Sequence, residues 1–174
     1  MRLRLRLILT LFRALFFGPR LSPSDVSVIK LRVWLNDVDI SHVTNDRYIA
    51  YMDLGRMDFV TRVGLLKIMA NRRWKPRARL TTIRNRHPLG LLQRFELHTS
   101  VIHWDDRWFW FKQEFIFNGR TTSIAYSKVG LANSRGMIKT QRILTEIGHP
   151  HESPAWHRAD AMIEIEEDLR AMQR

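Results

Sequence analysis

The chain has 174 residues, a length that fits one domain, with 45% hydrophobic and 26% charged residues. This composition is typical of a globular protein and excludes a disordered or fibrous one. There is no cysteine, which excludes disulfides, thiolate metal sites and cysteine nucleophiles. The formal net charge of +12 predicts an anionic partner, which is a nucleic acid, a membrane surface or a phosphorylated small molecule.

The N-terminal segment is both basic and apolar. Its apolar run from Leu7 to Phe17 is interrupted by Arg13 and is shorter than the ~20 residues that a membrane-spanning helix needs. As a helix, it would carry arginines on one side and large apolar residues on another, which is typical of a helix lying on an anionic membrane surface. The alternatives are a helix packed on its own domain or on a partner subunit, and a cleaved signal peptide. The signal peptide is disfavoured because residues 18–20 (Gly-Pro-Arg) form a poor cleavage site.

The next elements are a strand, a polar loop and a long helix. Alternating β-branched residues predict the strand over residues 26–35. Apolar residues spaced by threes and fours predict the helix from about Asn45 to Val63. Gly55 lies inside this helix, where glycine costs about 1 kcal/mol relative to alanine. We therefore expect close packing against a sheet at Gly55, and we expect Gly64 to end the helix.

The second half of the chain predicts an antiparallel meander followed by helices. In its longest strand the alternation places His103 on the face of Phe95 and Trp104 on the opposite face. Asn118-Gly119 is a strong hairpin signal between the last two strands. The predicted strands cover residues 78–84, 91–104, 108–117 and 120–132, a short helix covers 137–147, and a last helix runs from 153 to about 172.

A single long helix beside an antiparallel sheet has to be buried by that sheet. The predicted fold class is therefore α+β, with a curved antiparallel sheet wrapped around one central helix. We divide the chain into a basic N-terminal segment with its linker (1–25), a globular domain (26–147) and a C-terminal helix (148–174).

The loop before the long helix carries the residues that suggest chemistry. Asp37, Asp39 and His42 lie between a strand end and a helix start. Free backbone N–H groups and the helix dipole can polarise a carbonyl oxygen there. A nearby carboxylate can act as nucleophile or as general base on water. The alternative is a structural role for these residues, in which the aspartates brace the loop and His42 orients it through a hydrogen bond. The spacing matches no pattern of metal ligands, so no metal is expected.

This loop resembles the motif of hotdog-fold acyl-CoA thioesterases that reads D-x-D-x-N-x-H-x-N-N-x-x-Y, followed by Met-Asp-x-Gly-Arg. The first motif is matched by Asp37, Asp39, His42, Asn45 and Tyr48, and residues 52–56 match the second. The resemblance covers roughly residues 26 to 145 and also implies the hotdog arrangement of sheet and helix.

The resemblance also implies an activity, a substrate and a set of site residues. It implies hydrolysis of a fatty or aromatic acyl-CoA, with coenzyme A entering only as part of the substrate and no separate cofactor. It implies a homodimer or a dimer of dimers with active sites at the dimer interface. The catalytic residues would be Asp39 and His42, and the substrate-binding residues would be Asn45, Tyr48 and Met52.

The loop departs from the family pattern at three points. Ser41 stands where the family has asparagine, the loop is one residue shorter, and Asp46 adds a negative charge to the first helical turn. These changes keep a second hypothesis open, a non-catalytic hotdog protein that binds acyl chains or partners at a membrane.

Residues 60–95 contain no acidic residue and many arginines. They can bind the phosphates of coenzyme A, since arginine pairs well with phosphate oxygens, or they can form a solvated face. Nucleic acid is disfavoured as a partner, because the phenylalanines at 109, 111, 115 and 117 alternate like a buried sheet face. The expected location is cytoplasmic, with peripheral membrane contact through the N-terminus as a further expectation.

Overall fold

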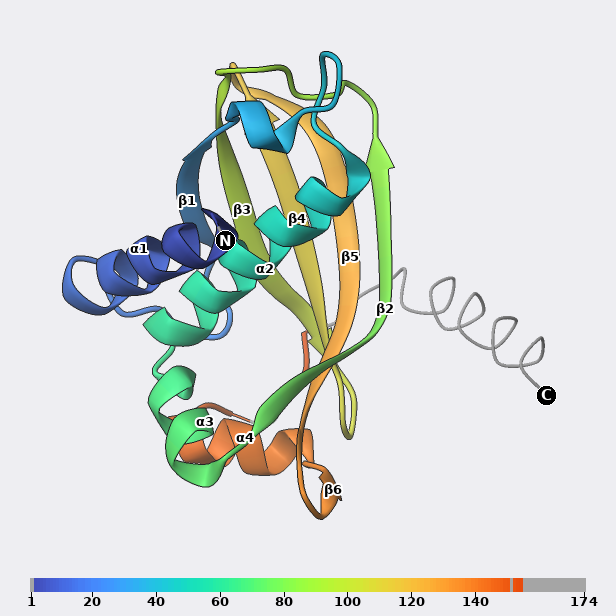
Figure 1. Ribbon diagram of the computed structural model, residues 1–174. Helices are drawn as coiled ribbons and strands as arrows, with labels where there is room; N and C mark the ends of the chain where they lie inside the picture. Colours follow the sequence, from blue (N-terminus) through green and yellow to red (C-terminus); the bar gives the residue numbers. More distant parts are fainter. Residues whose placement is uncertain (1, 151, 155–174) are drawn as a thin grey trace.

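The computed structural model of the chain describes residues 2–150 and 152–154 (Figure 1). The predicted last helix therefore lies almost entirely outside the described residues. No helix in the described part of the chain is long and apolar enough to cross a membrane. The elements in chain order are α1 (Arg2–Phe16), β1 (Ser27–Arg32), the 3-10 turn η1 (Leu35–Asp37), α2 (Asn45–Arg62), α3 (Leu65–Arg72), β2 (Lys75–Asn85), β3 (Arg94–Trp104), β4 (Phe109–Phe117), β5 (Arg120–Asn133), β6 (Gly136–Met137) and α4 (Thr140–Ile147).

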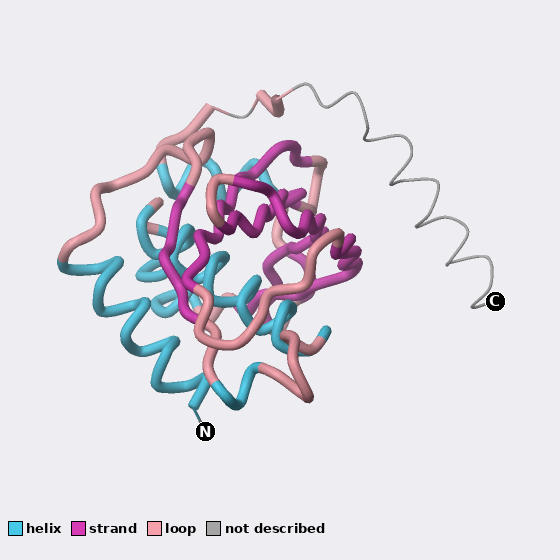
Figure 2. Tube along the Cα trace, turned by 90° about the horizontal axis from the view of Figure 1, so that it is seen from above, coloured by secondary structure: helices cyan, strands magenta, loops and turns pink. Residues whose placement is uncertain are grey.

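The strands form one antiparallel sheet in the order β1-β3-β4-β5-β2, and β6 pairs with β5. The sheet curls around α2, and α1 lies beside α2 near strand β1 (Figure 1). Seen from above, helical segments gather beside the curled strands (Figure 2). This arrangement confirms the predicted α+β class with a curved sheet around one central helix.

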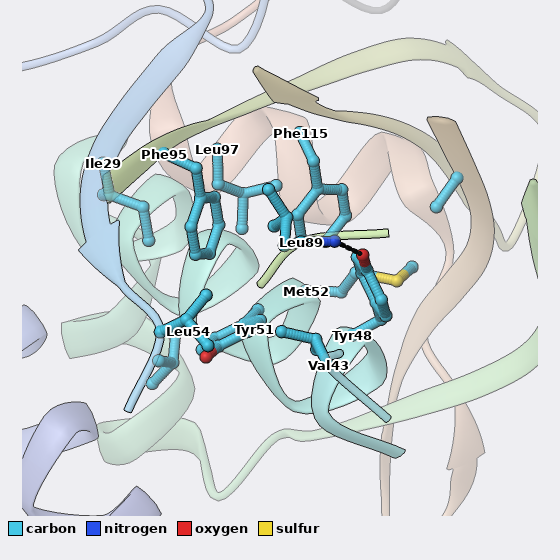
Figure 3. Close-up of a cluster of buried hydrophobic side chains, with 12 residues drawn as sticks. Ile29, Val43, Tyr48, Tyr51, Met52, Leu54, Leu89, Phe95, Leu97 and Phe115 are labelled. Carbon is cyan, nitrogen blue, oxygen red and sulfur yellow. Dashed lines mark hydrogen bonds between the residues drawn. The ribbon is translucent and has the colours of Figure 1, made fainter. Parts of the chain in front are cut away.

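The main core lies between α2 and the middle strands of the sheet (Figure 3). Tyr48 contacts the ring of Phe115 edge-on, with ring centres 5.1 Å apart, and Tyr51 contacts Phe95 in the same way at 5.1 Å. Edge-to-face contacts of this kind are favourable because the positive ring edge meets the negative ring face. All four rings are almost completely buried, so they anchor α2 to the sheet.

Helix α2 approaches the sheet closely at Gly55, as the sequence predicts. A Cβ atom built at Gly55 would lie 2.5 Å from Oγ1 of Thr99 and 2.9 Å from Nε2 of Gln113. Gln113 is fully buried, and its amide nitrogen donates to the Met52 carbonyl at 2.9 Å and to Thr99 Oγ1 at 3.0 Å. Its amide oxygen accepts a hydrogen bond from Arg56 at 3.0 Å. A satisfied buried amide therefore joins the middle of α2 to the sheet.

A β-bulge in β3 makes the predicted facing of two residues wrong. The pairing of β3 with β4 shifts by one residue between Val101 and His103. A bulge inserts one extra residue, so the side chains beyond it change sides. As a result Trp104 is buried and His103 is only partly buried, the reverse of the expected arrangement.

Helix α3 is an element that the sequence pattern does not predict. It starts after Gly64, whose φ of 82° is left-handed and suits glycine. Its buried side chains are Leu65 and Met69, and the half-buried Leu66 and Ile68 lie on either side of the exposed Lys67. Eight residues give only two turns, so the apolar spacing is too short to mark the helix.

We expect Gly55→Ala to lower the free energy of unfolding by about 1–3 kcal/mol, because the added methyl group overpacks a buried contact. In an open helix the same change would instead add up to about 1 kcal/mol. Urea unfolding measures the difference. Gly90→Ala is the matched control, because its built Cβ comes no closer than 3.5 Å to another atom and should change stability by under about 0.5 kcal/mol. A Gly55→Ala protein as stable as the wild type would contradict the close contact.

Candidate active site

The loop that carries Asp39 is a short hairpin between η1 and α2. Val38 pairs with Val43, and His42 forms a bridge to Gly90. The backbone N–H of Asp39 donates to the carbonyl of His42 at 3.2 Å. The hairpin thus brings the two predicted catalytic residues together at the backbone and attaches them to the chain segment before β3.

The side chains of Asp39 and His42 are both exposed. Nδ1 of His42 shares a hydrogen bond of 2.7 Å with the hydroxyl of Ser41, so the residue that departs from the family motif contacts the imidazole. Asp39 lines none of five cavities found between described residues. In the single chain its carboxylate therefore faces solvent, and a substrate cleft there needs a further surface.

Helix α2 starts directly after this hairpin. Thr44 is the N-cap residue in an extended conformation, and its carbonyl accepts hydrogen bonds from the N–H groups of Arg47 and Tyr48. The N–H groups at the start of a helix have no partner within it, so those of Asn45 and Asp46 point outward from the N-terminus of α2. The side-chain oxygen of Asn45 accepts a hydrogen bond of 3.4 Å from Asn85, the last residue of β2.

Tyr48 and Met52 lie in the hydrophobic core, where neither side chain is exposed. The hydroxyl of Tyr48 accepts a hydrogen bond of 2.9 Å from the N–H of Leu89, which attaches α2 to the segment that pairs with His42 (Figure 3). Both residues therefore lie on the core side of the loop that carries Asp39. Their contact with substrate stays a prediction.

Asp37 is the buried carboxylate of this region, with 4% of its side chain exposed. It accepts hydrogen bonds from Arg6 of α1 at 2.6 Å and from the N–H of Trp34 at 2.8 Å. Burial alone would raise the pKa of Asp37, but hydrogen bonds from Arg6, Trp34 and Tyr51 and the charge of Arg6 outweigh it and lower this pKa. Burial and the neighbouring Asp37 raise the pKa of the Tyr51 hydroxyl. Asp37 is therefore a charged brace of the loop.

Sequence reasoning did not find the partner of Asp37. Arg6 is 31 residues away along the chain, and the amphipathic pattern assigned it to a helix face rather than to the loop. A buried aspartate needs a cation, so the sequence allows the expectation that some arginine pairs with Asp37. The spacing of residues along the chain does not say which arginine it is.

Basic side chains lie near the start of α2. Arg84 and Arg86 flank Asn85, whose side chain contacts Asn45, and both arginines are exposed. Other members of the same basic stretch are engaged elsewhere: Arg72, for example, pairs with Glu146 at 2.6 Å.

A curved antiparallel sheet around one helix, with a carboxylate in the loop before that helix, is the architecture of hotdog-fold thioesterases. The chain belongs to the thioesterase-like superfamily, whose family model matches residues 33–160.

Animal proteins are among the relatives of this chain. The chain is 27% identical to Protein THEM6 of Drosophila melanogaster over 154 residues, which is 86% of this chain and 79% of the fly protein. It is 36% identical to Protein THEM6 of Danio rerio over 107 residues, which is 60% of this chain and 52% of the fish protein. The match thus spans about half the length of the fish relative.

Solved structures show the same fold. Gentisyl-coenzyme A thioesterase BH1999 superposes with a TM-score of 0.63 at 21% identity, covering 70% of this chain and 98% of that one. The 1,4-dihydroxy-2-naphthoyl-CoA thioesterase Slr0204 from Synechocystis has a TM-score of 0.61 at 12% identity, covering 72% of this chain and all of that one.

We expect Arg6→Gln to lower the free energy of unfolding by about 1–3 kcal/mol at neutral pH, because it leaves the buried Asp37 without its cation. The folded-state pKa of Asp37 is lowered, so its stabilisation is present above its unfolded pKa of about 3.9 and is lost as the pH falls through the folded value. The deficit of Arg6→Gln should therefore shrink as the pH falls below about 3.9.

Chemical unfolding of the wild type and of Arg6→Gln between pH 3 and 7 measures this difference in the free energy of unfolding. Arg13→Gln is the control, because Arg13 lies on the same helix and is exposed. Equal stabilities of the two variants at pH 7 would show that the Arg6–Asp37 ion pair contributes nothing.

Proposed function

We propose that this protein hydrolyses the thioester of an acyl-CoA to the free acid and coenzyme A. The observation that carries the proposal is the place of Asp39 in a hairpin that leads directly into the N-terminus of α2. Membership in the thioesterase-like superfamily supports the reaction class. The substrate is a fatty or aromatic acyl-CoA, a range that includes the aromatic acyl groups in the names of two structural neighbours.

In the proposed reaction the thioester carbonyl lies at the first turn of α2. The free N–H groups and the helix dipole there would stabilise the negative charge that develops on the carbonyl oxygen. Asp39 either removes a proton from water while the water oxygen bonds to the carbonyl carbon, or attacks that carbon itself to form an anhydride, which water then hydrolyses to the free acid. The carbon–sulfur bond then breaks, and the coenzyme A thiolate takes up a proton. His42, on the opposite side of the hairpin, assists in placing the water.

Asp46 adds a negative charge beside the proposed oxyanion position. Its carboxylate is hydrogen-bonded to the hydroxyl of Thr44 and lies 3.5 Å from the guanidinium of Arg47. These contacts partly neutralise the charge of Asp46 and so weaken its repulsion of negative charge at the helix terminus. The reaction as proposed uses no metal and no cofactor besides the coenzyme A of the substrate.

We propose that a second copy of the chain completes the substrate cleft, because Asp39 faces solvent in the single chain. Strand β2 is at the edge of the sheet, and its last residue, Asn85, contacts Asn45 at the start of α2. A homodimer paired along β2 would therefore have the candidate site beside its interface, and a dimer of dimers would keep this pairing. The proposed location is cytoplasmic, with peripheral membrane contact.

We expect Asp39→Asn to lower kcat at least about 100-fold, the usual scale for loss of a general base. Release of free thiol from acyl-CoA substrates of increasing chain length measures the rate. Asp106→Asn is the matched control, because Asp106 lies in the distant turn between β3 and β4 with 73% of its side chain exposed. An active wild type with an equally active Asp39→Asn variant would remove Asp39 from the mechanism.

The double variant Arg84→Gln, Arg86→Gln should raise KM for acyl-CoA about tenfold, because it removes two charge-assisted contacts to phosphate. It should leave KM for the matching acyl-pantetheine unchanged, since that substrate has no nucleotide phosphates. Arg135→Gln, which changes an exposed arginine between β5 and β6, is the control. An equal rise in KM for both substrates would assign the two arginines another role.

A second candidate is an acyl-CoA-binding protein without catalysis. Two observations favour it: the open position of Asp39, and the serine at position 41 in place of the asparagine of the motif. It predicts measurable binding of acyl-CoA by calorimetry together with no thiol release at any chain length.

A further inference from the structure

Helix α1 packs on the domain with most of its large apolar side chains turned outward. Arg6, Leu7 and Ala14 face inward: Leu7 packs against the main core, and Ala14 is only 5% exposed. A helix packed on a globular domain normally turns its apolar stripe to the core. Here the large apolar side chains are 52–75% exposed and form what we call the α1 face: Leu5, Ile8, Leu9, Phe12, Leu15, Phe16 and Phe17.

This orientation is held by specific contacts near both ends of the helix. Near the start, Arg6 bonds to Asp37 at 2.6 Å. After the end, the Arg62 side chain donates to the carbonyl of Pro19 at 3.0 Å, and the N–H of Leu21 donates to the carbonyl of Arg62 at 3.2 Å. The outward position of the α1 face thus belongs to the folded structure.

Cations surround the α1 face. No acidic residue precedes Asp25 in the sequence, and Arg13 and Arg20 are both exposed. A groove of about 400 Å³ between α1 and β1 is lined by further cations, including Arg32 and Lys30, of which Lys30 lies 3.5 Å from the Glu96 carboxylate. The acid among its lining residues, Asp58, is buried and accepts hydrogen bonds from the Ser27 hydroxyl and Arg62.

We infer that the α1 face docks onto a bilayer that contains anionic lipid. Its aromatic and aliphatic side chains would enter the boundary between headgroups and acyl chains, as in other interfacial helices. Each neighbouring arginine adds about 1 kcal/mol of attraction to a negatively charged surface. The inference goes beyond thioester hydrolysis and does not depend on it.

A second copy of the chain is a poorer occupant of the α1 face. A symmetric contact joins the same surface of both chains, so it would bring together two sets of exposed arginines, Arg13 and Arg20, with no acidic residue of α1 to pair with them. Not every arginine of α1 is available to lipid. Arg6, which the helical pattern places on the same side as Arg13, is turned inward and pairs with Asp37.

The absence of cysteine allows a direct test with single labels. Leu15→Cys and Ile49→Cys, which are 60% and 45% exposed in the wild type and lie on α1 and α2, are each labelled with an environment-sensitive fluorophore. The full chain is mixed with vesicles of phosphatidylcholine alone or with about a third phosphatidylglycerol. We expect a blue shift at position 15 with the anionic vesicles only, and no shift at position 49.

Flotation with the same vesicles tests the contributions of apolar and charged groups. Phe12→Ser combined with Phe16→Ser should lower the bound fraction at least tenfold, with Ile49→Ser as the matched control. Arg13→Gln should lower the partition coefficient about fivefold, the equivalent of about 1 kcal/mol. High salt should also lower the partition coefficient of the wild type, because it screens the attraction between arginine and lipid. Thermal unfolding shows whether each variant is folded.

Equal shifts at positions 15 and 49, or undiminished flotation of Phe12→Ser, Phe16→Ser, would overturn the inference. So would a wild type that does not float but sediments as a dimer that this variant dissociates, since a second copy would then cover the α1 face. Hydrolysis of a short-chain acyl-CoA without vesicles is unaffected by either result, so the two proposals fail separately.

Discussion

The close contact between helix α2 and the sheet at Gly55 determines where the other parts of the structure lie. No side chain fits there, and Gln113 joins the Met52 carbonyl, Thr99 and Arg56 across the contact. Because the middle of α2 is fixed in this way, its N-terminus comes to lie at one end of the sheet. The hydroxyl of Tyr48 then holds the segment that pairs with the Asp39 hairpin. The position of the Asp39 carboxylate thus depends on the packing of α2 against the sheet at Gly55.

The Arg6–Asp37 ion pair connects the candidate site with helix α1. A buried carboxylate is unstable without a cation, and Arg6 supplies it from the inward side of α1. The same contact turns the apolar side of α1 away from the domain. One interaction therefore braces the loop two residues before Asp39 and also exposes the surface that we assign to a membrane. Under the two proposals, the candidate active site lies on a domain that is docked to a bilayer through the α1 face.

Local sequence patterns predict the parts of this structure that local physics controls. The close contact at Gly55 and the turn at Asn118-Gly119, where both residues have positive φ, follow from the special properties of glycine and asparagine. The buried side of Trp104 does not follow, because the bulge before it is set by the register of two strands. Helix α3 does not follow either, because its two turns carry too short an apolar pattern. The Arg6 partner of Asp37 is non-local, and no spacing rule selects it. For the candidate site, the motif predicts which residues share the loop, but burial separates Asp39 at the surface from Tyr48 in the core.

The most direct measurement is a crystal structure of the full chain with a ketone analogue of an acyl-CoA, in which a methylene group separates the carbonyl from the sulfur. We expect the ketone oxygen to accept hydrogen bonds from N–H groups in the first turn of α2, with the Asp39 carboxylate beside the carbonyl carbon and a second chain closing the cleft. An analogue bound elsewhere, with Asp39 still facing bulk solvent, would contradict the assignment of this loop as an active site.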